Sequence, residues 1–414
     1  MALTSACAKT PVTVRSAIDA PANDLSSINA TALEGRTSEE SSYVGGVWDP
    51  RYFDRFLDSR QLKMKGLKQR YTREGIGIPL VGVRLTDTKN EFYYPPEGIT
   101  RPVTAVVLKD QLGRPYTRFF DPSVHSQVLV DGVVQPLAAD FSLPYALLLS
   151  RTNFEQLRIT ATIWHDELDE RSGVFLLEPY NPAKIPLLMV HGLLSSPITW
   201  RELSNEIVGD ELLRTHYQIW HAVYPTGIPY LHAAADFRER LAHLLKHLDP
   251  DGSQFASQHI VVVAHSKGGL LCKTLLADSG DKLWNAAFKV PASGLEASPE
   301  DIKEMKSFLH FNKNPSVKRA IFIATPHRGS SVADDPIMSF LSSIISLPGR
   351  DAGPFERVLK DNRDKVTEAF CDRHDGQLPN GPRALSNADP LIAVLADLPT
   401  GETPFHTIVG EETP

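Results

Sequence analysis

The sequence contains few cysteines, no long apolar run and no strong excess of charge. Its three cysteines, Cys7, Cys272 and Cys371, are too few and too scattered for a disulfide framework or for the paired-cysteine type of metal site. The longest apolar runs, such as residues 260–264, are far shorter than the roughly 20 residues that cross a bilayer. We therefore expect no transmembrane segment, no metal site and no cofactor.

The charged residues are mixed along the chain and nearly balanced. The 43 Lys and Arg residues and 50 Asp and Glu residues give a formal net charge of −7. Because polyanion binding needs a concentration of positive charge, we expect no nucleic-acid partner. The hydrophobic fraction of 42% is typical of a folded globular protein. The sequence carries no signal for an oligomeric state.

The first seven residues, Met1-Ala-Leu-Thr-Ser-Ala-Cys7, place small residues before a cysteine. This pattern is typical of the end of a secretory or lipoprotein signal, and it predicts an extracytoplasmic or membrane-anchored protein. The charged and apolar segments of a complete signal are not there. An unstructured terminus is therefore the alternative interpretation.

A length of 414 residues favours two domains over a single core. Residues 1–44, rich in Ser, Thr, Ala and Asp, predict a disordered leader. Residues 45–178 contain short β-rich runs broken by Pro and Gly, and predict a β-rich accessory domain. Residues 179–414 alternate strand and helix patterns, and predict an α/β domain with a mostly parallel sheet flanked by helices.

Three local patterns stand out in the accessory domain. The spacing of apolar residues over residues 51–70 is helical. Asp131-Gly132 lies between two β-branched runs, which predicts a two-residue hairpin turn, since Gly tolerates the positive φ of such a turn. Residues 157–163 alternate apolar and polar side chains and predict a strand with one buried face.

The α/β domain is predicted to contain five strands. Between the last two lies a segment of about eighty residues, too long for a simple connection, and we expect residues 331–400 to form a helical cap or lid with helices near 337–345 and 356–370. The predicted strands are residues 185–190, 217–223, 260–264, 319–324 and 406–409, and the predicted helices between them are residues 200–207, 236–248 and 268–277.

The strongest functional signal is Ala264-His-Ser-Lys-Gly268, which follows a buried strand and precedes a helix. A serine in a sharp strand-to-helix turn projects its Oγ from the edge of the sheet, as the nucleophile of a hydrolase requires. Ala264 replaces the first glycine of the usual Gly-x-Ser-x-Gly pattern, and Gly268 keeps the second. We predict Ser266 as the nucleophile; the alternative is an ordinary turn with an idle serine.

A second signal is Val190-His-Gly-Leu193, at the end of the first strand of the α/β domain. The loop that follows such a strand can direct a backbone N–H at the oxyanion of the substrate, so we predict the amides of Leu193 and Lys267 as the oxyanion hole. His191 and Gly192 are expected to shape this loop, with His191 acting through side-chain hydrogen bonds rather than as a base. His265 is expected to pack beside the turn.

Together these motifs resemble bacterial α/β-hydrolases of the lipase and esterase kind, including the branch similar to GPI-inositol deacylases. The resemblance extends over about residues 180–414 and also rests on Tyr224-Pro-Thr-Gly227 and Ala324-Thr-Pro-His-Arg-Gly-Ser330. It implies an α/β-hydrolase fold. It also implies that His327 is structural or lines the cleft and is not the catalytic base.

The resemblance leaves the catalytic triad incomplete. The family places an acid and then a histidine after the nucleophile, and no histidine follows His406 here. Glu411 or Glu412 stands near the acid position, and the acid and histidine are expected beyond Pro414. A truncated chain lacking the last strand and helix, a degenerate binding module, and a histidine recruited from elsewhere are the three explanations. We favour truncation, and we expect the chain as given to hydrolyse esters weakly or not at all.

Two functions follow. The first is a serine hydrolase that cleaves carboxylic esters, from lipids or other small molecules, through an acyl-enzyme on Ser266. The second is a catalytically inactive hydrolase-fold protein that binds a ligand or partner, motivated by the missing histidine.

Overall fold

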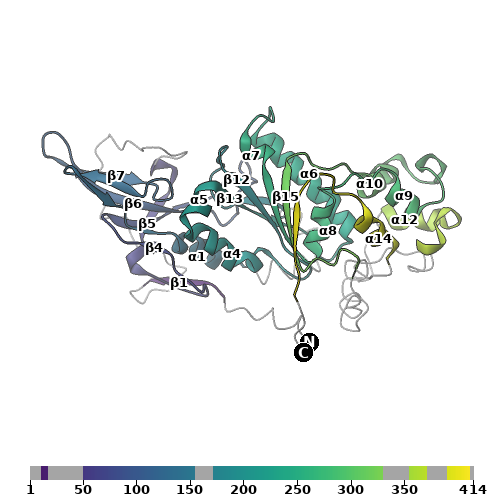
Figure 1. Cartoon of the computed structure of the whole chain (residues 1–414), viewed down its shortest axis with the longest axis horizontal. Helices are drawn as coiled ribbons and strands as arrows, with labels where there is room; N and C mark the ends of the chain where they lie inside the picture. The colour runs from purple at the N-terminus through teal and green to yellow at the C-terminus, as the bar shows by residue number, and fades with distance from the viewer. Residues whose placement is uncertain (1–10, 17–49, 154–170, 330–353, 371–388, 411–414) are drawn as a thin grey trace. The chain divides into compact units, whose positions relative to one another are not determined.

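The computed structural model describes residues 11–16, 50–153, 171–329, 354–370 and 389–410 (Figure 1). The chain divides into two compact units. The first unit comprises residues 1–153, 175–184 and 200–219, and the second comprises residues 154–174, 185–199 and 220–414. The domain ranges 45–178 and 179–414 stay predictions. None of the described helices is both long and apolar enough to span a bilayer.

The first unit is built around a four-stranded antiparallel sheet. Phe53, Leu80, Val103 and Phe119 share one hydrophobic core on it. The sheet has the order β2-β5-β6-β7, with β2 at Arg55–Asp58, β5 at Ile78–Arg84, β6 at Ile99–Lys109 and β7 at Pro115–Phe120. Helix α1 (Ser142–Arg151) packs against β6 and is buried over most of its length because its residues are almost all apolar.

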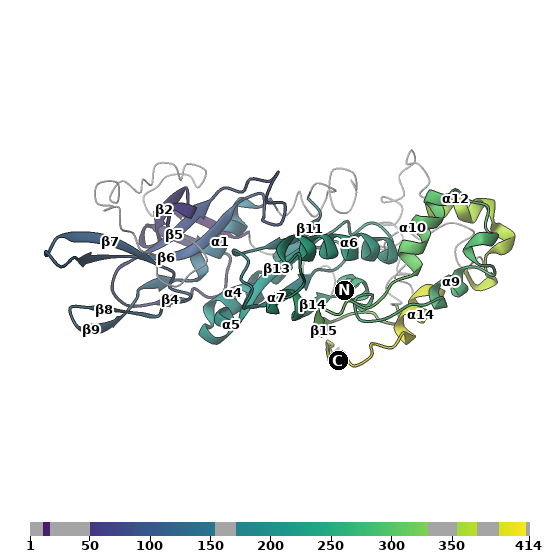
Figure 2. The same cartoon turned by 90° about the horizontal axis from the view of Figure 1, so that it is seen from above.

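Shorter strands and helices complete this unit. The predicted hairpin is confirmed: β8 (Gln127–Val130) pairs with β9 (Val133–Pro136), and Asp131 and Gly132 between them have φ values of 49° and 80° (Figure 2). The remaining elements are β1 (Thr13–Ser16), β3 (Leu62–Lys65), β4 (Thr72–Arg73), β10 (Ala139–Asp140), α4 (Arg201–Gly209) and α5 (Glu211–His216).

The helix predicted over residues 51–70 is wrong. The segment forms β2, a 3-10 turn at Ser59–Gln61 and β3, with β2 paired to β5 and β3 to β1. Leu57 and Leu62 are buried on different sheets, so a spacing that fits one helical face also fits two short strands separated by a turn. Asp58 caps that turn by accepting from the Arg60 backbone N–H at 2.9 Å. Strand β1 lies within the range predicted as a leader.

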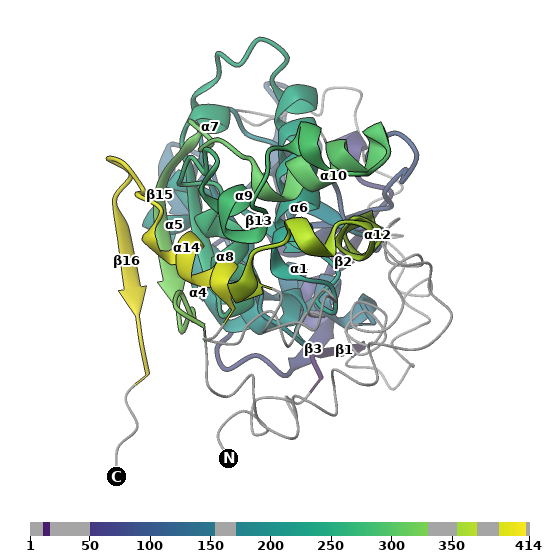
Figure 3. The ribbon, with the colours of Figure 1, turned by 90° about the vertical axis from the view of Figure 1, so that its right-hand side faces the viewer.

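The α/β part contains a six-stranded sheet of order β11-β13-β12-β14-β15-β16. The pairs β12/β14, β14/β15 and β15/β16 are parallel, and β16 lies at the edge next to β15 (Figure 3). Five of the strands match the predicted ones within about two residues. The bounds are β11 at Gly173–Leu176, β12 at Ile185–Val190, β13 at Tyr217–Val223, β14 at Ile260–His265, β15 at Val317–Ile323 and β16 at Phe405–Ile408.

Helices accompany these strands as the alternating pattern predicts. Helix α8 packs on β14, and α6 packs on α8. The bounds are α6 at Tyr230–Leu248, α7 at Phe255–Gln258, α8 at Lys267–Lys273, α9 at Lys282–Ala287, α10 at Pro299–Leu309, α12 at Pro354–Asp361 and α14 at Pro390–Asp397. Within the predicted cap, α12 and α14 are described, whereas the helix near 337–345 and the strand at 157–163 lie outside the described residues.

Candidate active site

The chain turns sharply at Ser266, between the end of β14 and the start of α8. Ser266 has φ 52° and ψ −126°, a conformation that costs a non-glycine residue about 1–3 kcal/mol. Two backbone hydrogen bonds hold it there: its N–H donates to the Ile323 carbonyl, and its own carbonyl accepts from the Gly269 N–H, each at 2.9 Å. The strained turn is thus fixed between β15 and the first turn of α8.

Two glycines let the loop after β12 press against this turn. An ideal Cβ on Gly268 would lie 2.4 Å from the His191 carbonyl oxygen, and one on Gly192 would lie 2.9 Å from the Ser266 Cβ. Both distances are below any that real Cβ atoms show, so neither position has room for a side chain. The fold therefore brings His191, Gly192, Ser266 and Gly268 together.

His191 is buried at the start of the loop after β12. Its Nδ1 lies 3.1 Å from the Gly192 carbonyl oxygen, and its ring stacks on Tyr224 with centroids 4.7 Å apart. The Tyr224 hydroxyl donates to the His191 carbonyl at 2.7 Å. Burial lowers the pKa of His191 to about 4. His191 is therefore neutral at pH 7, and the loop-shaping role expected from the sequence stays a prediction.

Lys267 follows the serine and is fully buried. Its Nζ donates to the Thr226 carbonyl at 2.7 Å and to the Ile228 carbonyl at 2.5 Å. Burial lowers the pKa of Lys267 to about 7. The side chain thus links the turn at Ser266 to the segment after β13. This role of Thr226 and Ile228 was not predicted from the sequence, although the motif Tyr224-Pro-Thr-Gly227 lies in the same segment.

The backbone amides of Lys267, next to Ser266 in the chain, and of Leu193, next to Gly192, have no backbone acceptor among the described residues. Lys267 is the first residue of α8, and the first N–H groups of a helix have no acceptor within it. Leu193 comes directly after Gly192 and is half-buried. The next residue, Leu194, has a positive φ of 54°, so the backbone bends at this point of the loop.

The other histidines near the turn pack against neighbouring side chains. A Cβ on Gly192 would lie 3.0 Å from the His265 Nδ1, so the His265 ring lies against the loop after β12. The His327 ring meets Phe322 edge to face, with centroids 4.6 Å apart. Burial, and then the charge of Lys273, lower the pKa of His327.

No described histidine donates to or accepts from the Ser266 hydroxyl. Nor do the described residues contain a cluster of three or more His, Cys, Asp or Glu side chains that is able to hold a metal ion. The described site therefore consists of a strained serine, two glycine contacts and two amides.

Comparisons with known proteins give limited similarity. No family model matches the chain. Protein SERAC1 of Danio rerio is 25% identical over 194 residues, which span 38% of this chain and 28% of that protein.

Solved structures with similarity are bacterial lipases and esterases. The mature Bacillus licheniformis lipase BlEst2 is 17% identical, with a TM-score of 0.29 over 56% of this chain and 70% of that chain. The apo form of Thermogutta terrifontis esterase 2 is 13% identical, with a TM-score of 0.26 over 57% of this chain and 77% of that chain. These scores are too low to carry an argument, so the architecture rests on the strand order and the turn described above.

Proposed function

We propose that the protein is a serine hydrolase of the α/β-hydrolase type that cleaves carboxylic esters through an acyl-enzyme on Ser266. The observation that carries the proposal is the position of Ser266, in a strained turn between a buried parallel strand and a helix. A fold retains a non-glycine residue in such a conformation when the surroundings fix it, and such residues concentrate at active sites.

In this proposal the Leu193 and Lys267 amides stabilise the oxyanion. The Ser266 Oγ attacks the ester carbonyl and gives up its proton to a general base outside the described residues, negative charge develops on the carbonyl oxygen, and the two amides donate to it. Gly192 and Gly268 support the arrangement because they allow the loop after β12 to approach the turn. Collapse of the intermediate expels the alcohol, which takes up the proton from the base, and water then attacks the acyl-enzyme, releases the acid and restores the Ser266 hydroxyl.

The substrate is proposed to be a small-molecule or lipid ester, with residues 331–400 shaping the acyl pocket. The SERAC1 similarity covers only 28% of that protein, so it adds no substrate to this proposal.

A second candidate is a hydrolase-fold protein that binds a ligand without catalysis. The observation that favours it is the Ser266 hydroxyl, which has no histidine partner among the described residues. A serine hydroxyl is a weak nucleophile unless a base accepts its proton.

A fluorophosphonate probe separates the two candidates, since it phosphonylates only an activated serine. We expect covalent labelling at Ser266 in the full-length protein, detected by peptide mass spectrometry, and its loss in Ser266→Ala. Ser253→Ala removes an exposed serine from a loop of the same unit and serves as the matched control. Undiminished labelling of Ser266→Ala would refute the assignment, and an unlabelled, folded full-length protein would favour the binding protein.

A further inference from the structure

A small cavity lies within the first unit, and all the residues that line it belong to that unit. The space in it that is open to the centre of a water-sized sphere is about 60 Å³. One water needs roughly 10–15 Å³ of such space, so the cavity has room for a few water-sized groups. Much of the wall is apolar, and part of it comes from side chains of α1, α4 and β13. Four charged side chains also reach it: Arg101, Glu178, Lys184 and Arg214.

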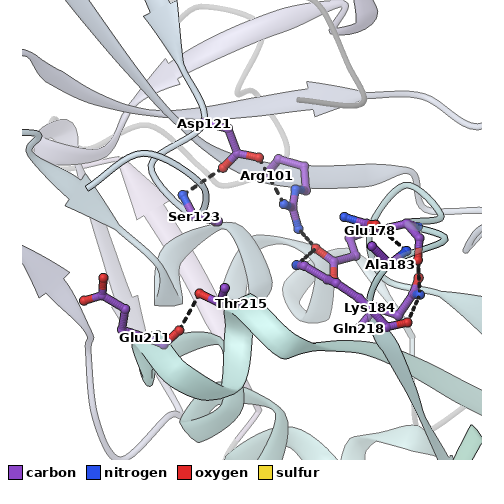
Figure 4. A network of polar contacts seen from close by, with 10 residues as sticks. Arg101, Asp121, Ser123, Glu178, Ala183, Lys184, Glu211, Thr215 and Gln218 are labelled. Atoms are coloured by element: carbon purple, nitrogen blue, oxygen red, sulfur yellow. Dashed lines mark hydrogen bonds and ion pairs between the residues drawn. The ribbon is translucent and has the colours of Figure 1, made fainter. Parts of the chain in front are cut away.

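Three of these charges balance one another with the help of Asp121. The Arg101 guanidinium lies between two carboxylates, pairing with Glu178 and, at 3.4 Å, with Asp121 (Figure 4). Lys184 Nζ is 3.2 Å from the other oxygen of Glu178. Two cations thus face two carboxylates, and this part of the wall carries no net charge.

Arg214 is the charge that is left over. It is 93% buried, with 7% of its surface exposed, and its guanidinium lies 3.9 Å from the centroid of the Phe141 ring. Its nearest carboxylate, on Glu211, is 3.8 Å away on a side chain that is 70% exposed, so water weakens the attraction. The Arg214 Nε is buried and has no hydrogen-bond partner among the described residues.

A second arginine adds to this positive charge. Arg73 lies over the same Phe141 ring at 5.4 Å, and its Nη1 is also buried without a described partner. Burial lowers the pKa of Arg214; the charge of Glu211 opposes this effect, the positive charge of Arg73 adds to it, and the charges of Asp210 and Asp121 oppose it further. The polar end of the cavity therefore favours an anion.

We propose that this cavity binds a short-chain monocarboxylate. The carboxylate accepts hydrogen bonds from the Arg214 Nε and the Ser123 hydroxyl, and charge-assisted bonds of this type are the strong ones. The alkyl chain packs against the apolar wall, which disfavours a strongly hydrated anion such as phosphate. The small volume limits the chain to a few carbons. This site is separate from Ser266 and does not depend on the proposed ester hydrolysis.

Isothermal titration of the full chain with butyrate and with inorganic phosphate at constant ionic strength tests the proposal. We expect saturable binding of butyrate and none of phosphate. Arg214→Met should weaken butyrate binding by about tenfold or more, since it removes a charged donor. The matched control is Arg114→Met, which removes an arginine that is exposed and paired with Asp110 away from the cavity, and it should bind as the wild type does.

Two milder variants keep the test decisive if Arg214→Met does not fold. Ser123→Ala removes one neutral donor and should weaken binding about fivefold. Val208→Phe enlarges a half-buried side chain in the cavity wall and should abolish binding without unfolding the chain. The proposal is overturned if the wild type shows no saturable butyrate binding, if phosphate binds equally well, or if both milder variants keep wild-type affinity.

Discussion

The Nζ of Lys267 donates to the backbone carbonyl of Thr226, 2.7 Å away and 41 positions earlier in the chain. A second carbonyl, of Ile228, accepts from the same nitrogen, and the structure gives this nitrogen no carboxylate partner among the described residues. A neutral amine has two N–H donors, which match the two carbonyls. Lys267 can therefore lose its proton and keep both hydrogen bonds, which fits a site that disfavours charge.

This arrangement predicts a dependence of stability on pH. The pKa of Lys267 is about 7 in the folded chain, against an ordinary value of 10.5. Between these values the unfolded chain holds a proton that the folded chain has lost, so the free energy of unfolding rises with pH, by up to about 1.4 kcal/mol per pH unit. Below pH 7 both states are protonated and the contribution is flat.

Urea unfolding at pH 7 and pH 9.5 checks this prediction. Lys267→Met should remove this rise in the free energy of unfolding. The difference in the free energy of unfolding, wild type minus Lys267→Met, should therefore increase from pH 7 to pH 9.5. Lys289→Met replaces an exposed lysine of the same unit and should leave the rise intact. If the free energy of unfolding changes with pH in the wild type as it does in Lys267→Met, Lys267 stays charged in the folded chain.

The strain at Ser266 predicts that glycine there stabilises the fold. Ser266 has φ 52°, and glycine adopts positive φ without the steric cost that a Cβ brings. Ser266→Gly should therefore be more stable than Ser266→Ala by about 1 kcal/mol, although both lose fluorophosphonate labelling. Thermal unfolding of the pair checks this. Equal stability of the two variants would mean that the turn carries no strain in solution.

The contact between Gly268 and the loop after β12 predicts a strong effect of one added methyl group. An alanine Cβ at position 268 would lie 2.4 Å from the His191 carbonyl oxygen, and backbone cannot give way as a flexible side chain does. Gly268→Ala should lower the free energy of unfolding by about 1–3 kcal/mol and reduce labelling of Ser266 at least tenfold. Gly410→Ala, where nothing lies within 4 Å, is the control and should change neither.

The strands of the α/β part could be predicted from the sequence, whereas the contacts between residues far apart in the chain could not. Strand β14 was predictable because a continuous apolar run with small residues after it leaves few alternatives, and Val262 and Ala264 are fully buried as expected. Residues 51–70 were mispredicted because the burial of Leu57 and Leu62 is decided by two different partner strands. The bonds of Lys267 were missed because they join a side chain to backbone carbonyls about forty residues away.

The buried charges of the first unit give the last prediction. Glu178 faces both Arg101 and Lys184. Burial raises its pKa, but the charges of Lys184 and Arg101 outweigh this effect, and the pKa ends below the ordinary value of 4.5. Because the folded pKa is depressed, the ionised form of Glu178 contributes stability above about pH 4.5, and this contribution is lost as the pH falls through the folded pKa.

Glu178→Gln should therefore cost about 3–5 kcal/mol at pH 7, since it leaves Arg101 with Asp121 alone and removes the carboxylate that pairs with Lys184. The difference in the free energy of unfolding between the variant and the wild type should shrink as the pH falls from about 4.5 through the folded pKa of Glu178, because the wild-type carboxylate then becomes neutral as well. Chemical unfolding from pH 7 down to pH 3 measures both effects. Glu239→Gln, on the exposed face of α6, should change stability little at any of these pH values. A loss in Glu178→Gln that stays constant down to pH 3 would mean that the residue acts through its packing and not through its charge.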